Sequence, residues 1–71
     1  MNYYGFHIKS SHRSVSTEYL VIAKNEEKAE ELIQKEVSVI LSQKDAWIWG
    51  TPIVSKIENV KEMLNANLIF Q

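Results

Sequence analysis

The chain has 71 residues, of which 45 % are hydrophobic and 24 % are charged, with a formal net charge of −1 and no cysteine. This length allows one domain with a thin core, and the composition excludes a disordered chain. The near-neutral charge argues against bulk attraction to nucleic acid or anionic membranes, and the lack of cysteine excludes disulfides and thiolate metal sites.

We expect a single domain over residues 1–71 in the cytoplasm, without membrane attachment. The first residues lack the basic and apolar regions of a signal peptide. The longest apolar runs have four residues, whereas a membrane span needs about 20.

Two strands are predicted first. In residues 3–9, Tyr4, Phe6 and Ile8 alternate with more polar neighbours, which is typical of a half-buried strand. Residues 10–14 form a polar connection, and residues 16–23 alternate again. The simplest arrangement is an antiparallel hairpin.

A helix over residues 25–42 is the strongest local signal. Asn25 is a suitable N-cap, and Glu26 and Glu27 follow at the positive end of the helix dipole. Glu31 and Lys35 are spaced for an ion pair. The predicted apolar stripe consists of Ala29, Leu32, Ile33, Val37, Ile40 and Leu41. We expect the helix to end between Ser42 and Asp45.

Residues 46–57 are predicted to be extended, as one edge strand bent at Pro52 or as two short strands. Asn59 is a candidate N-cap for a short helix over residues 60–65, with Met63 and Leu64 turned inward. The apolar tail, residues 68–70, is expected to dock on the core or on a partner.

These elements predict an α+β fold of the order β-β-α-β, followed by a short C-terminal helix or tail. The three strands form an antiparallel sheet with the preferred order 2-1-3, and the order 1-2-3 is the alternative. One helix covers one face of the sheet, so the other face is left for binding.

The sequence contains no motif typical of catalysis. Gly-rich phosphate loops and HExxH pairs are absent, and the two histidines, His7 and His12, lack further ligands at suitable spacing. The acids of the predicted helix lie opposite its apolar stripe, where water keeps them ionised. We therefore predict a protein that is not an enzyme and binds no metal or cofactor.

Binding residues are suggested by one basic loop and by aromatic side chains. Residues 9–14 combine three basic side chains with three serines, a composition that can contact phosphates. Aromatic residues on the predicted strands have three alternative roles: they pack in the core, form a protein interface or stack on bases. The candidate partner-binding residues are Tyr3, His7, Lys9, His12, Arg13, Tyr19, Trp47 and Trp49.

Residues 19–29, YLVIAKNEEKA, join a strand to a capped helix. In this unit, and in its small cysteine-free composition, the chain resembles small phage or mobile-element proteins of the anti-CRISPR inhibitor type. The resemblance implies a protein-binding module that inhibits a larger bacterial protein complex, and it assigns no functional residue. A nucleic-acid-binding module using Lys9, His12 and Arg13 is the alternative. Homodimerisation through the bare sheet face or the third strand is compatible with either.

Overall fold

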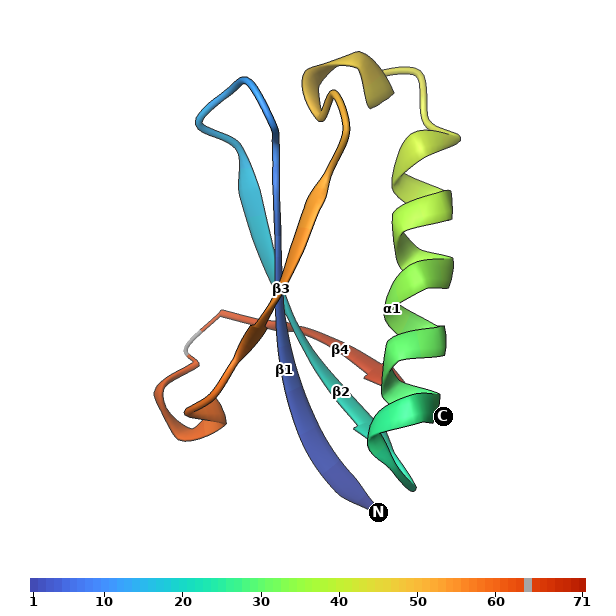
Figure 1. The fold of residues 1–71 in the computed structure, drawn as a ribbon, viewed down its shortest axis with the longest axis vertical. Helices are drawn as coiled ribbons and strands as arrows, with labels where there is room; N and C mark the ends of the chain where they lie inside the picture. The colour runs from blue at the N-terminus through green and yellow to red at the C-terminus, as the bar shows by residue number, and fades with distance from the viewer. Residues whose placement is uncertain (64) are drawn as a thin grey trace.

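One long helix packs on one face of a four-stranded mixed sheet in the computed structural model, which describes residues 1–63 and 65–71 (Figure 1). The strands are β1 (Asn2–Lys9), β2 (Ser16–Ala23), β3 (Ile53–Ile57) and β4 (Asn67–Phe70). The helix is α1 (Glu26–Leu41), and two short 3-10 helices are η1 (Ala46–Ile48) and η2 (Val60–Glu62). The α+β class is therefore confirmed.

The predicted hairpin is confirmed. β1 and β2 pair antiparallel, with Tyr4 opposite Val21 and Phe6 opposite Tyr19. The alternation puts the even-numbered residues of β1 and the odd-numbered residues of β2 on the helix-covered inner face, because side chains of a strand alternate between faces. Phe6, Tyr19 and Val21 are accordingly buried.

Helix α1 begins and ends close to the predicted positions. The Asn25 side chain accepts a hydrogen bond from the Lys28 N–H at 2.9 Å, as an N-cap does. Ser42 caps the other end. Two details differ: Leu41 is 45 % exposed rather than part of the packed stripe, and Glu31 pairs with Lys28 at 3.2 Å instead of with Lys35.

The prediction that residues 46–57 are extended is wrong for their first part. The Ile48 N–H donates to the Asp45 carbonyl and the Trp49 N–H donates to the Ala46 carbonyl, which makes η1 a tight 3-10 turn. This turn reverses the chain after α1, and only Ile53–Ile57 forms a strand. Trp47 and Trp49 are therefore not on the sheet.

The sheet has four strands in the order β3-β1-β2-β4. Its first three strands have the preferred order, with β1 in the centre and antiparallel to both neighbours. The prediction of a purely antiparallel three-stranded sheet is wrong, because the tail forms β4 and pairs parallel to β2. The apolar tail thus docks on the same domain.

The connection from β3 to β4 crosses the outer face, the face opposite α1 (Figure 1). It passes over Gly5, where an added Cβ would lie 2.8 Å from Met63 Sδ and 3.0 Å from Val60 Cγ1. A larger residue at position 5 would require these side chains to shift. The outer face is therefore partly covered and not bare throughout.

The predicted short helix after residue 59 is reduced to η2. The Asn59 side chain accepts a hydrogen bond from the Lys61 N–H at 3.2 Å, so the predicted cap is present. Met63 follows as an extended residue. The predicted inward orientation of Leu64 lies outside the described residues.

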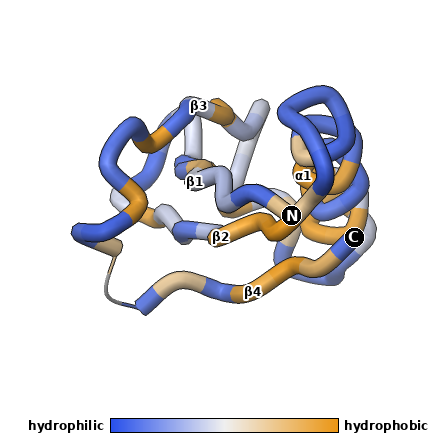
Figure 2. Tube along the Cα trace, turned by 90° about the horizontal axis from the view of Figure 1, so that it is seen from below, coloured by the Kyte–Doolittle hydropathy of each residue, from blue (hydrophilic) through white to orange (hydrophobic). Residues whose placement is uncertain are grey.

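The core lies between the inner face of the sheet and α1. Its buried apolar side chains are Phe6, Ile8, Tyr19, Val21, Ala23, Ala29, Ile33 and Ile40. The hydropathy colouring shows apolar segments concentrated on α1, β2 and β4, with β4 lying beside β2 (Figure 2). The second half of β4 thus extends the apolar character of β2 to the edge of the sheet.

Candidate functional site

Apolar side chains line up across three strands on the outer face, near the N-terminus of α1. Tyr3 lies opposite Ile22, and Ile22 lies opposite Phe70. The next row pairs Leu20 with Leu68. We call Tyr3, Leu20, Ile22, Leu68 and Phe70 the outer patch.

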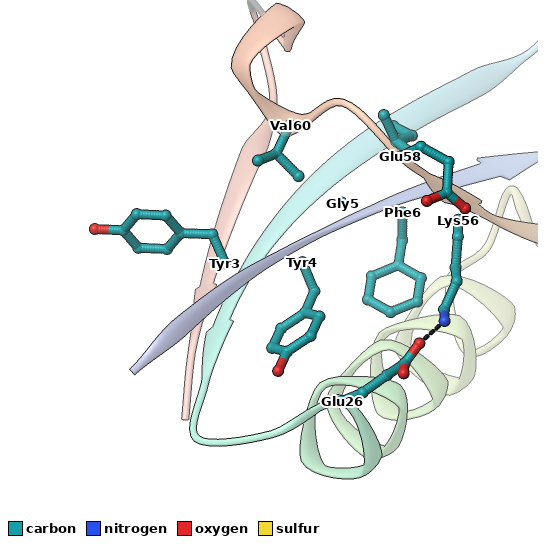
Figure 3. A pocket seen from close by; sticks show the side chains of 9 residues that line it. Tyr3, Tyr4, Gly5, Phe6, Glu26, Lys56, Glu58 and Val60 are labelled. Carbon is teal, nitrogen blue, oxygen red and sulfur yellow. Dashed lines mark ion pairs between the residues drawn. The ribbon is translucent and has the colours of Figure 1, made fainter.

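The outer patch is strongly exposed. Tyr3 is 63 %, Leu68 58 % and Phe70 65 % accessible, whereas Leu20 and Ile22 are half-buried beneath them. Adjacent exposed apolar residues of this kind mark interaction surfaces more often than scattered ones do. Tyr3 points away from α1, whereas Tyr4 and Phe6 point toward it (Figure 3).

The edge of β4 adds unpaired backbone groups beside the outer patch. The Gln71 N–H donates to the Ile22 carbonyl at 2.9 Å, so Gln71 faces β2. Because neighbouring residues of a strand point their backbone groups to opposite sides, those of Leu68 and Phe70 point away from β2. Both edge residues can therefore pair with an added strand.

The hairpin corner, residues 9–16 together with residues 46–51, lies at the opposite end of the sheet. Ser10 is 2 % exposed, and its Oγ donates to the Ile48 carbonyl at 2.7 Å. The same oxygen accepts the N–H groups of His12, at 3.2 Å, and Arg13, at 3.0 Å. One hydroxyl thus shapes the hairpin loop and joins it to η1.

Further hydrogen bonds hold the two segments of the hairpin corner together. The Ser11 N–H donates to the Trp49 carbonyl at 3.1 Å, and the Thr51 N–H donates to Ser11 Oγ at 3.0 Å. Gly50 has a φ of +61°, which glycine adopts without the steric cost of a side chain. The corner is therefore a fixed structure rather than two independent loops.

Two of the predicted binding residues meet in the hairpin corner. The Arg13 guanidinium carbon lies 4.7 Å from the Trp47 ring centroid, a cation–π contact. Trp47 is nevertheless 62 % exposed. His7 and Lys9 line an open hollow of about 330 Å³ together with Arg13. His12 is exposed in the same loop.

The other predicted residues lie elsewhere. Tyr19 is 7 % exposed in the core, and its hydroxyl donates to Glu36 Oε2 at 2.9 Å. Burial, together with this hydrogen bond, raises the pKa of Tyr19 to about 12. Trp49 is half-buried and packs against the core. Tyr3 belongs to the outer patch at the far end of β1.

A second hollow, of about 200 Å³, lies where β1 extends beyond the end of β3 (Figure 3). Its charged side chains include Lys56 and Glu26, which form an ion pair. Glu58 and Tyr4 also line it. Because Lys56 is paired with Glu26, this hollow offers little positive charge to a ligand.

Most of the outer patch was not predicted. Leu20, Ile22, Leu68 and Phe70 are ordinary strand residues in the sequence, and only the pairing of β4 with β2 brings them beside Tyr3. Two features of the sequence indicate the patch. Leu20 and Ile22 point to the strand face opposite the core residues, and the apolar tail at residues 68–70 requires a surface to pack against.

Within residues 1–63 and 65–71, no three His, Asp or Glu side chains come together as a metal site would require. No helix in the described part of the chain has the length and apolar character to cross a membrane. The chain matches no protein-family model, and no curated protein or solved structure shows significant similarity to it.

Proposed function

We propose that this chain is a non-enzymatic protein-binding module, and that the outer patch is its contact surface. The observation that carries the proposal is the row Tyr3, Ile22 and Phe70, in which two aromatic side chains remain more than 60 % exposed. Aromatic residues on a rigid sheet are favourable anchors, because they bury much area at little cost in conformational entropy.

The size of the outer patch fits an anchor within a larger interface. Tyr3, Leu68 and Phe70 together expose roughly 350 Å², if a fully exposed large side chain presents about 150–250 Å². A standard interface buries about 800 Å² on each partner. The partner must therefore extend beyond the patch, and the backbone edge of β4 is the adjacent surface for such contacts.

The proposed partner is a component of a larger bacterial protein complex, which the chain would inhibit as a phage or mobile-element protein. This finer proposal is supported by the resemblance in the segment 19–29 and by the small, cysteine-free composition. A nucleic-acid module that stacks bases on the sheet is less well supported, since Trp47 and Trp49 are in or beside η1 and Tyr19 is buried.

The test compares two double variants in quantitative affinity capture from a bacterial lysate. Leu68→Asn with Phe70→Ser removes the exposed apolar groups of β4. Val39→Ser with Leu41→Asn is the matched control, because these residues are 49 % and 45 % exposed on α1, away from the patch. We expect one protein to be retained by the wild type and by the control but lost with the β4 variant.

The captured protein is then purified and titrated against each variant. Truncating an anchor of an interface costs about 2 kcal/mol, which corresponds to roughly 30-fold weaker binding. If no retained protein depends on β4, or if both double variants lose it equally, the proposal is wrong. Light scattering of the pure chain tests for self-association. If the wild type is a dimer and the β4 variant is a monomer, the partner is a second copy of the chain.

A further inference from the structure

The hollow at the hairpin corner is lined mainly by basic and hydroxyl side chains. Its residues are His7, Lys9, Arg13, Ser14, Val15 and Ser16, and none of them is acidic. This composition departs from that of the whole chain, which carries one more acid than bases. A surface that gathers Lys, Arg and Ser around one hollow favours an anionic group.

The hollow contains two permanent cations, Lys9 and Arg13. The ion pairs formed among residues 1–63 and 65–71 use Lys28 and Lys56, and neither Lys9 nor Arg13 takes part. Arg13 lies over the face of Trp47, which orients the planar guanidinium but leaves the N–H groups at its rim able to donate. This arrangement suits bidentate contact with a tetrahedral oxyanion.

The backbone beneath the hollow is ordered before any ligand arrives. Ser10 Oγ accepts the N–H groups of His12 and Arg13 and donates to the Ile48 carbonyl. Ser11 adds bonds to Trp49 and Thr51. A ligand therefore pays little of the entropy that ordering a flexible loop would cost.

Two acidic side chains, Glu18 and Glu62, lie to one side of the hollow. Glu18 is opposite His7 across the β1–β2 ladder, and Glu18 and Glu62 line a separate hollow together with Ile57. An anion is therefore favoured at the Lys9 and Arg13 end, beyond His7. Ser14 and Ser16 supply neutral hydrogen-bond donors at that end.

We propose that the hairpin corner is a binding site for the phosphate ester of a nucleotide, held by Lys9, Arg13, Ser14 and Ser16. Arg13 covers part of the Trp47 ring, but the residue is still 62 % exposed, so the remaining ring surface is available for the base to stack on. This site lies at the opposite end of the sheet from the outer patch and does not depend on the protein-binding role. A free nucleotide and a single strand offer the same phosphate chemistry.

The test is an amide NMR titration at low salt with a 5′-mononucleotide and, separately, with inorganic phosphate. We expect shifts confined to the hairpin corner and His7, and Lys9→Ala and Arg13→Ala should each weaken binding about tenfold. Lys44→Ala and Lys61→Ala are the matched controls, because these exposed lysines lie outside the hollow. Both controls should bind as the wild type does.

The contribution of Trp47 is measured with Trp47→Ala. Loss of the cation–π contact and of the stacking surface should weaken mononucleotide binding about 2- to 10-fold, while inorganic phosphate, which has no base, should be affected less. Arg13→Lys retains the charge but not the planar fork, and should bind more weakly than the wild type. Equal loss for both ligands would overturn the assignment of base stacking to Trp47.

A short oligothymidylate distinguishes the two sources of phosphate. If the oligothymidylate binds more tightly than the mononucleotide, the ligand is a single strand of nucleic acid. In that case Lys9→Ala should reduce the slope of log affinity against log salt concentration by about one. Equal affinity identifies a free nucleotide. The site is refuted if millimolar mononucleotide causes no shifts in the hairpin corner. It is also refuted if chloride at matched ionic strength causes the same shifts, or if Lys9→Ala and Arg13→Ala bind as the controls do.

Discussion

At the hairpin end of the sheet, two loops are joined by hydrogen bonds in which a nearly inaccessible hydroxyl, Ser10 Oγ, takes part three times. At the opposite end, Tyr3 of β1 and Phe70 of β4 lie exposed on either side of Ile22 of β2. At the first end, backbone groups of both loops are hydrogen-bonded to the side chains of Ser10 and Ser11, whereas the second end leaves apolar side chains and a strand edge exposed. The difference separates the part that maintains the shape from the part that we propose to bind protein.

The largest expected effect is that of Gly50→Ala in the hairpin corner. An added Cβ would lie 2.3 Å from Ser11 Oγ and 2.6 Å from His12 Nδ1, and φ is +61°. A left-handed conformation costs a residue with a side chain about 1–2 kcal/mol, and overpacking adds about 1 kcal/mol or more. We expect urea denaturation to show a loss of about 2–3 kcal/mol with an unchanged m-value.

Thr51→Ala is the control for this variant, because Thr51 is exposed and uses only its backbone N–H in the corner. The urea concentration at its denaturation midpoint should stay near that of the wild type. An unchanged midpoint in Gly50→Ala would mean that the two loops are not held together as tightly as their hydrogen bonds imply.

Ser10→Ala should have the next largest effect. The substitution leaves two backbone N–H groups and the Ile48 carbonyl without their partner, and an unsatisfied buried group costs about 1–3 kcal/mol. Ser14→Ala changes an exposed serine of the same loop and should remain within about 0.5 kcal/mol of the wild type. Equal midpoints for the two variants would show that water replaces the bonds of Ser10.

The two ends also differ in how far the sequence predicts them. The alternation in β1 and β2 and the cap at Asn25 are local signals, so the hairpin and α1 follow from neighbouring residues. The pairing of β4 with β2 is not local, because it joins residues about 50 positions apart through a crossing over Gly5. The outer patch exists only through this pairing.

The sequence predicts the basic residues of the hairpin corner but not how they are arranged in space. Lys9, His12 and Arg13 stand out in the sequence, whereas the contact of Arg13 with Trp47 depends on η1. The alternation of residues 46–50 is too short to distinguish a strand from a 3-10 turn. Serine at position 10 gives no sign that it is buried, since its role comes from the carbonyl of Ile48.

Tyr19 provides a smaller, pH-dependent test in the core between the two ends. Its pKa is raised to about 12 in the folded chain, from 10.0 for an ordinary tyrosine. Below pH 10 both states are protonated and its stabilisation is complete; between pH 10 and about 12 only the unfolded state loses the proton, so stability falls. The advantage of the wild type over Tyr19→Phe should therefore shrink across this window in denaturation experiments. An advantage that stays constant would contradict the raised pKa.

The smallest expected effect is that of Glu26→Gln, a substitution at the same end of the sheet as the outer patch but beside β3. Glu26 and Lys56 form an ion pair, but both side chains are about half exposed, so water already solvates the charges and the pair contributes less than about 1 kcal/mol. Glu27→Gln removes a neighbouring acid of the same first turn, and so accounts for the lost interaction with the helix dipole. The difference between the two variants reports the ion pair alone and should be below about 1 kcal/mol in urea denaturation. If the difference between Glu26→Gln and Glu27→Gln exceeded the loss of stability in Ser10→Ala, an exposed charge pair would stabilise the fold more than a buried neutral hydroxyl does. The comparison of the two ends would then be wrong.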